Sequence, residues 1–261
     1  MPDLTSELAS DWPYPTLIAH RGGGRHAPEN TLAGMRAASE HGFAYVEYDV
    51  KLAGDNVLVL LHDDTVDRTT DGQGLAKDMT RVQLQALDAG SWRDPRYAGE
   101  RIPTFEETAR LTQSLQLLSN VEIKPCPGRD HETGAAVALA ARALWKDAAV
   151  KPLLSSFSEE ALTAAHVAAP ELPRALLVEQ VPVDWHEKMV RHDCVALNVN
   201  QKNVTQDLIE AVHERGYRIA AYTVNDPQRA RELLQWGIDG LFTDELASIA
   251  PSRLDTPPIQ R

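Results

Sequence analysis

Short apolar runs alternate along this chain with longer stretches of helical periodicity, and this alternation restricts its possible folds more than any other feature. Parallel strands cannot be joined by tight turns, so each crossover needs about a dozen residues or more, usually as a helix. The pattern therefore predicts a parallel sheet covered by helices. The nine predicted strands are 17–20, 45–50, 57–62, 117–123, 153–157, 175–178, 196–199, 218–224 and 240–243.

The second and third of these runs break the alternation. Only residues 51–56 separate them, which is too short for a crossover helix, so they are predicted to form an antiparallel hairpin. A two-residue turn at Gly54 and Asp55 would place His62 opposite Glu47. The other eight runs are then parallel. We expect them to close into a TIM-type (β/α)8 barrel, a fold that suits 261 residues.

The expected domain organisation is a single barrel domain over residues 1–261, with helices near 31–41, 104–115, 132–147, 158–168, 184–192, 205–215 and 226–236. Residues 63–103 interrupt the alternation and are predicted to form an inserted cap subdomain over the barrel mouth, since long loops in compact domains are usually functional. A solvated excursion without a role is the alternative interpretation. Residues 251–261 contain Pro257-Pro258 and are expected to be a frayed tail.

Composition limits the partners and the compartment. The formal net charge of -12 argues against binding to nucleic acid or to an anionic membrane, because both require a basic surface. Two cysteines give no disulfide framework and favour a reducing compartment. Asp3, Glu7 and Asp11 occupy the positions where a signal peptide needs a basic start and an apolar core. We therefore expect a cytoplasmic protein without stable membrane association.

The first strand leads directly into a candidate site. His20 and Arg21 follow the apolar run Leu17-Ile18-Ala19 and precede three glycines, which allow the backbone to turn tightly and to approach a ligand. A histidine can transfer a proton near neutral pH, and an arginine can bind an anion with a planar set of donors. Taken alone, the same residues also fit an ordinary solvated turn.

Acidic residues accompany two further strands. Strand alternation places Glu47 and Asp49 on one face of the run 45–50, and it places Glu122 and Lys124 on one face of another run. Barrel active sites lie at the carboxyl ends of the strands, so these side chains should meet there. Three carboxylates suit a hard divalent cation such as Mg²⁺ or Ca²⁺, with Mn²⁺ a further candidate. A solvated acidic face and a Glu-Lys pair at the rim are the alternatives.

A second histidine, His62, ends the third run and is followed by Asp63, which could orient the imidazole. Cleavage of a phosphodiester needs a base for the attacking oxygen and an acid for the leaving alcohol, and two histidines can serve both needs. Asn30 is expected to cap the helix near 31–41. Other polar residues at strand ends could line the mouth: Ser155, Ser156, Asn198, Asn200, Tyr222, Thr223, Asn225 and Asp244.

Taken together in their order, these motifs resemble the glycerophosphodiester phosphodiesterase family, and in particular its short bacterial cytoplasmic members. The resemblance extends from about Trp12 to Pro251. Tyr222 stands where many members carry tryptophan, which bears on how the glycerol moiety is stacked. The matching motifs are His20-Arg21-Gly22, Pro28-Glu29-Asn30-Thr31, Glu47-x-Asp49, His62-Asp63, Glu122-Ile123-Lys124 and Tyr222-Thr223-Val224-Asn225.

The resemblance implies a TIM barrel with a small insertion that hydrolyses glycerophosphodiesters, such as glycerophosphocholine and glycerophosphoethanolamine, to sn-glycerol 3-phosphate and an alcohol. It implies a divalent cation on Glu47, Asp49 and Glu122. His20 and His62 are then the acid-base pair in an unassigned order, while Arg21, Lys124 and Tyr222 bind the substrate. The nucleophile is either water or the neighbouring glycerol hydroxyl, the second route passing through a cyclic phosphate.

Two other functions fit the same residues less well. A phospholipid head-group phosphodiesterase that leaves a cyclic product should have an exposed apolar rim for approach to a membrane. A non-catalytic barrel that binds phosphorylated small molecules would have no use for two histidines beside three carboxylates. The sequence leaves the oligomeric state open, as either monomer or homodimer.

Overall fold

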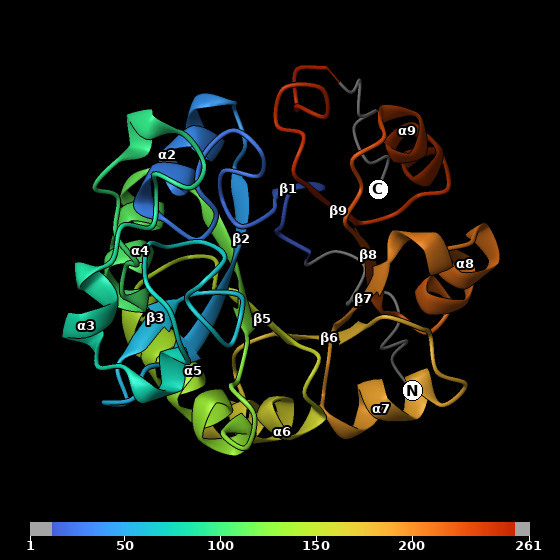
Figure 1. Cartoon of the computed structure of the whole chain (residues 1–261). Helices are drawn as coiled ribbons and strands as arrows, with labels where there is room; N and C mark the ends of the chain where they lie inside the picture. The colour runs from blue at the N-terminus through green and yellow to red at the C-terminus, as the bar shows by residue number, and fades with distance from the viewer. Residues whose placement is uncertain (1–11, 254–261) are drawn as a thin grey trace.

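The computed structural model describes residues 12–253, which form the predicted α/β barrel. Eight parallel strands follow the order β1-β9-β8-β7-β6-β5-β4-β2, and the pairing of β1 with β2 closes the ring (Figure 1). The parallel strands are β1 (Leu17–Ala19), β2 (Tyr45–Leu52), β4 (Leu118–Ile123), β5 (Leu153–Ser156), β6 (Arg174–Val178), β7 (Ala196–Asn200), β8 (Arg218–Tyr222) and β9 (Gly240–Thr243).

Helices surround the barrel, and their apolar faces pack on the outer face of the sheet (Figure 1). A smaller apolar cluster fills the barrel interior near the amino ends of the strands, with Ile18, Tyr45, Leu153 and Phe242 among its members. Because this apolar cluster occupies the interior near the amino ends, polar side chains that face the interior lie nearer the carboxyl ends of the strands. The helices outside the barrel are α2 (Leu32–Glu40), α4 (Phe105–Ser114), α5 (Asp130–Leu144), α6 (Glu159–Ala168), α7 (Trp185–Arg191), α8 (Gln206–His213) and α9 (Pro227–Gln235), with the short 3-10 turn η3 (Gln201–Asn203).

Strand β2 shows the predicted alternation of faces. Val46, Tyr48 and Val50 belong to the core between the sheet and the helices. Glu47 and Asp49 therefore face the barrel interior, and both are buried there. Two ionisable side chains are thus held in a closed interior by the same alternation that buries their apolar neighbours.

The predicted hairpin is confirmed, but its predicted register is wrong by one residue. Strand β3 (Leu58–Leu60) pairs antiparallel with β2, and Leu60 lies opposite Val50. The loop contains three residues, Gly54 to Asn56, because Ala53 N–H donates to the Val57 carbonyl. Asn56 adopts a left-handed φ of 64°, as the last residue of such loops commonly does. The extra loop residue moves His62 out of the predicted position opposite Glu47.

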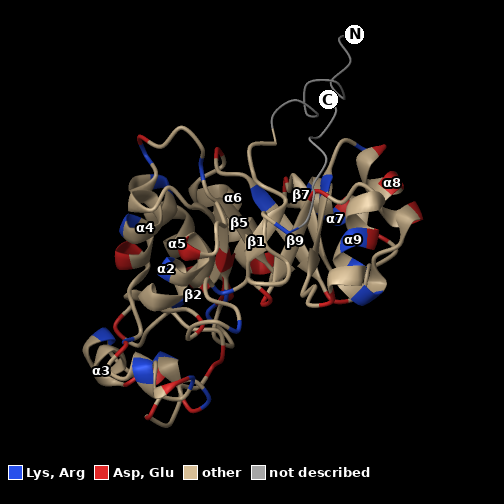
Figure 2. Cartoon of the chain, turned by 90° about the horizontal axis from the view of Figure 1, so that it is seen from above, with Lys and Arg blue, Asp and Glu red and all other residues tan. Residues whose placement is uncertain are grey.

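The segment between β3 and α4 carries short elements and a small apolar core of its own. It contains η1 (Ala76–Asp78), α3 (Arg81–Ala86) and η2 (Pro95–Tyr97). Val66, Leu84 and Ile102 are buried together in it. Figure 2 shows that the part bearing α3 projects from one end of the barrel. Tyr97 Oη donates to the His26 carbonyl over 2.8 Å, which ties this segment to the loop after β1.

The start of α2 differs from the prediction. Thr31, and not Asn30, is the N-cap, since its side chain accepts from the Gly34 N–H. Asn30 instead has a φ of 56° and turns its side chain toward β2. Over residues 12–253, no helix has both the length and the hydropathy needed to cross a bilayer. The expectations for residues 1–11 and 254–261 concern parts of the chain outside the described range.

Candidate active site

The site begins with two strands that end facing each other along one edge of β2. Strand β1 contacts only the start of β2, where Ala19 pairs with Val46, and β3 occupies the same edge from Val50 onward. Between them, Gly22 N–H donates to the Glu47 carbonyl and Leu61 N–H donates to the Asp49 carbonyl. His20 and His62, which lie just after the ends of β1 and β3, therefore approach the same part of β2 from opposite directions.

Three carboxylates meet beside these histidines. Asp49 pairs in register with Glu122 on the neighbouring strand β4, and oxygens of Glu47, Asp49 and Glu122 all lie within 4.8 Å of one another. Their exposed fractions are 2%, 1% and 7%. Glu47 Oε1 and Asp49 Oδ1 are buried without a hydrogen-bond partner. Buried, unpartnered carboxylate oxygens at this spacing fit a divalent cation, which prefers oxygen ligands.

The proximity of the carboxylates moves their pKa values apart. Burial and the negative charge of Asp49 raise the pKa of Glu47 to about 8 and that of Glu122 to about 7. Burial opposes ionisation of Asp49 as well, but the charges of Arg21, His62 and Lys124 outweigh it and hold the Asp49 pKa well below its ordinary range. Asp49 is thus the carboxylate of the three that ionises most readily, while burial and the charge of Asp49 oppose the ionisation of Glu47 and Glu122.

Two cations border the carboxylates. The Lys124 ammonium lies 2.7 Å from Glu122 Oε1, as their shared strand face predicts. The Arg21 backbone N–H donates to Glu47 Oε2 over 2.9 Å, and its guanidinium lies 3.5 Å from Asp49 Oδ2. Asn30 forms two hydrogen bonds with Asp49. The Asn30 side-chain amide donates to Asp49 Oδ2, and the Asp49 backbone N–H donates to Asn30 Oδ1. The predicted anion-binding side chains therefore lie beside the predicted cation ligands.

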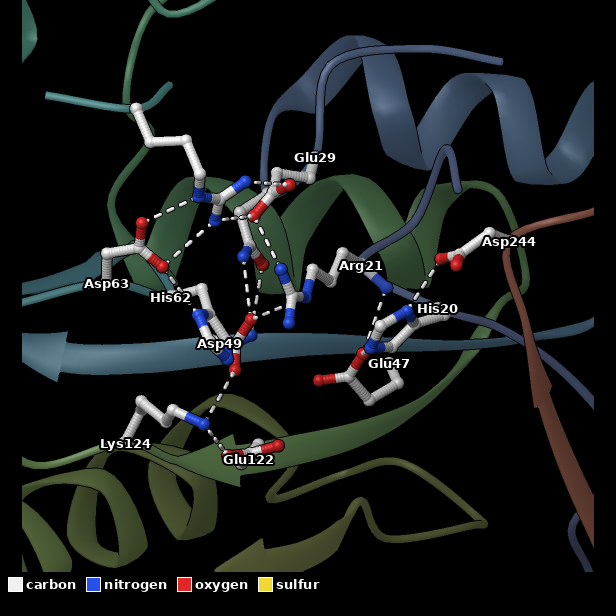
Figure 3. A network of polar contacts seen from close by, with 12 residues as sticks. His20, Arg21, Glu29, Glu47, Asp49, His62, Asp63, Glu122, Lys124 and Asp244 are labelled. Atoms are coloured by element: carbon white, nitrogen blue, oxygen red, sulfur yellow. Dashed lines mark hydrogen bonds and ion pairs between the residues drawn. The ribbon is translucent and has the colours of Figure 1, made fainter. Parts of the chain in front are cut away.

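Each histidine is oriented by a carboxylate. His62 Nδ1 lies 2.7 Å from Asp63 Oδ1, and His20 Nδ1 lies 2.7 Å from Asp244 Oδ1 (Figure 3). Burial lowers the pKa of His20, but the hydrogen bond to Asp244 and the charge of Glu47 outweigh it, so the pKa is raised. Burial and the charges of Arg21 and Lys124 lower the pKa of His62, and they outweigh the charge of Asp49 and the hydrogen bond to Asp63. Their environments push the pKa values of the two imidazoles in opposite directions.

A second arginine, Arg68, connects the insertion to both halves of the site, a role that no motif in the sequence predicts. The Arg68 guanidinium forms two hydrogen bonds with Glu29 and two with Asp63, over 2.6 to 2.9 Å. Glu29 also accepts from Arg21 over 2.8 Å. Arg68 thus holds Asp63 behind His62 and Glu29 behind Arg21. This role of Arg68 is visible only in the tertiary structure, since 39 positions separate Arg68 from Glu29 in the sequence.

These groups open into a cavity of about 320 Å³ at the carboxyl ends of the strands. Tyr222 and Phe157 line it, with their rings in edge contact, and the Tyr222 hydroxyl donates to the Val178 carbonyl. Neutral polar side chains complete the lining: Asn120, Ser155, Asn200 and Thr223. A larger cavity of about 530 Å³, bordered by Trp12 and Tyr14, lies at the opposite end of the barrel, away from the carboxylates and the histidine pair.

A family model described as the glycerophosphoryl diester phosphodiesterase family matches residues 20–248. That range begins at His20 and extends beyond Asp244. The chain belongs to this family. The resemblance of its motifs and the predicted barrel are thereby confirmed.

Individual members of the glycerophosphoryl diester phosphodiesterase family resemble the chain over most of its length. A glycerophosphodiester phosphodiesterase of Caldanaerobacter subterraneus is 34% identical over 234 residues, which are 88% of this chain and 93% of the relative. One from Bacillus altitudinis is 30% identical over 235 residues, or 87% and 94% of the two chains. An Oleispira antarctica phosphodiesterase, solved in complex with its product sn-glycerol-3-phosphate, superposes with a TM-score of 0.84 at 37% identity, covering 89% of this chain and 94% of that chain.

Proposed function

We propose that this chain hydrolyses glycerophosphodiesters to sn-glycerol 3-phosphate and an alcohol. The observation that carries the proposal is the group of three buried carboxylates between two carboxylate-oriented histidines. The sn-glycerol-3-phosphate product held by the similar Oleispira antarctica enzyme supports the substrate class. The cavity in front of the carboxylates, at about 320 Å³, suits a small molecule.

Glu47, Asp49 and Glu122 are the proposed ligands of one divalent cation, Mg²⁺, Ca²⁺ or Mn²⁺, because their oxygens lie within 4.8 Å of one another and one buried oxygen each of Glu47 and Asp49 lacks a hydrogen-bond partner. Such a cation polarises phosphoryl oxygens and offsets the charge that develops on them. Arg21 and Lys124 supply further positive charge beside the same oxygens, and both point toward the carboxylate group. Tyr222 borders the cavity as the proposed contact for the glycerol moiety.

His20 and His62 are the proposed acid-base pair. Of the two imidazoles His62 has the lowered pKa, which favours its neutral form, so we assign it to accept the proton of the attacking oxygen. His20 has the raised pKa and lies at the edge of the cavity, where a leaving alcohol would depart, so we assign it to protonate that alcohol. Asp63 and Asp244 hold each ring by Nδ1, which leaves Nε2 to face the substrate.

One assay separates this function from its alternatives. Glycerophosphocholine is incubated with the protein and Mg²⁺, with and without a chelator, and the products are followed by phosphorus NMR. Cation-dependent release of choline and sn-glycerol 3-phosphate is the expected result. Accumulation of a cyclic phosphate would instead indicate a lyase. If several glycerophosphodiesters bind but none is cleaved, the chain is a binding protein and the proposal fails.

The setting of this activity is also part of the proposal. We infer a cytoplasmic enzyme, with residues 63–103 as a subdomain at the barrel mouth, acting on a small molecule and not on nucleic acid or a membrane. Both cysteines are buried and free, in keeping with a reducing compartment. Arg68 and Trp92 of the insertion border a cavity next to His20, which supports a place for this segment beside the substrate. Monomer and homodimer both remain compatible with this function.

A further inference from the structure

A second cavity, of about 340 Å³, adjoins the catalytic one. His20 and Arg21 line both cavities, so the two spaces meet at the proposed acid and at a proposed phosphate ligand. A phosphodiester carries two ester-linked groups, here called its arms: the glycerol moiety and the leaving alcohol. If its phosphorus lies at this junction, one arm extends into each cavity.

The two cavities differ in the chemistry of their walls. Besides the proposed cation ligands and Lys124, the catalytic cavity offers neutral amides and hydroxyls beside Tyr222 and Phe157, which suit the hydroxyls and carbons of a glycerol moiety. The second cavity is bordered by four arginines, which are Arg21, Arg25, Arg68 and Arg93, against the two carboxylates Glu29 and Asp244. This positive lining stands out in a chain whose formal net charge is -12.

The carboxylates of the second cavity are already engaged. Asp244 binds His20, and Glu29 binds Arg21 and Arg68. Arg25 pairs with Glu245 at 2.6 Å. Arg93 makes no ion pair with any carboxylate of residues 12–253, and its guanidinium donates to the Arg25 carbonyl. Arg93 therefore carries a positive charge at the cavity that an acidic ligand can neutralise.

The loop that carries Arg93 is held in place before any ligand binds. The Asp88 carboxylate accepts four hydrogen bonds of 2.8 Å, from the N–H groups of Gly90, Ser91 and Gly99 and from the Ser91 hydroxyl. Trp92 Nε1 donates to the Ala89 carbonyl, and its ring borders the cavity with 37% of its surface exposed. A fixed arginine beside an aromatic wall can bind an acidic group without paying a large ordering cost.

We propose that the second cavity receives the leaving alcohol, and that it selects glycerophosphodiesters whose alcohol carries an acidic group, a carboxylate or a phosphate. This inference rests on the proposed function, since it assigns the leaving arm of the same substrate. Arg93 pairs with the acidic group, Trp92 covers the carbon atoms of the alcohol, and Arg25 adds positive charge at the rim. A quaternary ammonium head group meets the same positive field and is disfavoured there.

The test compares two substrates that differ by one carboxylate. Glycerophosphoserine is glycerophosphoethanolamine with a carboxylate added to its alcohol, and both release sn-glycerol 3-phosphate. We expect the wild-type kcat/KM to be about two- to fivefold higher for the serine substrate, an effect of the size given by a partly exposed charge pair. Arg93→Gln should bring the ratio of the two kcat/KM values close to one, and Arg25→Gln should lower it less.

A matched variant controls for loss of surface charge. Arg96 lies three positions after Arg93, is exposed, and is absent from the lining of both cavities, so Arg96→Gln should keep the wild-type ratio. Thermal unfolding of all three variants checks that they fold. A wild-type ratio of one or below, or an unchanged ratio in Arg93→Gln, overturns the head-group inference while the hydrolysis itself stands. Absence of sn-glycerol 3-phosphate from both substrates refutes the proposed function and the inference with it.

Discussion

His20 Nδ1 and Asp244 Oδ1 lie 2.7 Å apart, although 224 positions separate the two residues. The contact follows from the closure of the barrel. Strands β1 and β9 are parallel neighbours in which Ala19 pairs with Thr243, so the residue that follows each strand end meets the other. The last strand of the chain thereby orients the imidazole that the first strand delivers to the site.

Asp244→Asn is expected to lower kcat about 10- to 100-fold, because the neutral amide neither orients nor stabilises a protonated His20 as the carboxylate does. The hydrogen bond to Asp244 raises the His20 pKa, so its loss should move the His20 limb of the pH–kcat profile to lower pH. Asp239→Asn is the matched control, since Asp239 contacts His213 at the same 2.7 Å outside the site. A profile unchanged in Asp244→Asn would contradict this role.

Cation binding should stabilise the protein more at pH 8 than at pH 6. Without a cation, the pKa values of Glu47, about 8, and Glu122, about 7, exceed the ordinary 4.5, so these groups favour the folded state when protonated. Their contribution is complete below about pH 4.5 and is lost as the pH rises through 7 to 8. The Tm with and without Mg²⁺, measured at both pH values, checks this.

Asp49→Asn provides the control for that measurement, because it removes the firmly ionised member of the proposed ligand set. The variant should show a much smaller Tm shift with Mg²⁺ at both pH values. Calorimetric titration of the wild type at pH 6 in two buffers of different ionisation enthalpy should also detect proton release on binding. Equal Tm shifts at pH 6 and pH 8 together with no proton release would argue against a cation on these carboxylates.

Arg68→Gln should lower kcat by about tenfold, because the second-row partners of catalytic groups typically contribute on this scale. Arg68 reaches His62 through Asp63 and Arg21 through Glu29, so the losses from Asp63→Asn and Arg68→Gln should be less than additive in the double variant, because the two residues share the route to His62. Arg101→Gln is the control, since within residues 12–253 that arginine donates only to the Ala86 carbonyl. Fully additive losses in the double variant would show that Arg68 acts through another route.

Asn30→Ala should reduce the free energy of unfolding by about 2–4 kcal/mol, since it breaks two buried hydrogen bonds to Asp49, one of them to a charged oxygen. It also places alanine in a left-handed conformation, where φ is 56°. Asn30→Gly loses the same hydrogen bonds without that backbone cost and should be about 1 kcal/mol less destabilised. Urea denaturation measures both. If Asn30→Ala were as stable as the wild type, the structural role of Asn30 would be contradicted.

Much of the fold was predictable because its signals are local. The alternation of runs predicted all nine strands, and the short link after β2 predicted the antiparallel pair. Alternation within β2 and β4 was enough to place Glu47, Asp49 and Glu122 on inner faces, and the strand ends brought His20 and Lys124 to the same end of the barrel. The structure thus assembles the candidate side chains, while their roles await the experiments above.

The register of the β2–β3 hairpin depends on packing that the local sequence does not specify. A two-residue and a three-residue loop both fit Gly54-Asp55-Asn56, and the choice between them depends on which apolar residues of β3 pack inward. The structure has the three-residue loop, so Leu60 pairs with Val50 and His62 approaches Asp49. The composition of the turn alone carries no information about this packing.

The sequence by itself determined the barrel, the faces of its strands and the residue types gathered at its mouth, because periodicity and strand ends are properties of neighbouring residues. Only the tertiary structure decided which groups orient them: Asp244 on His20, Arg68 on Asp63 and Glu29, and Asn30 on Asp49. These partners lie 5 to 224 positions apart. Their contacts depend on how the barrel closes and on the path of the long loops, and neither leaves a periodic trace in the chain.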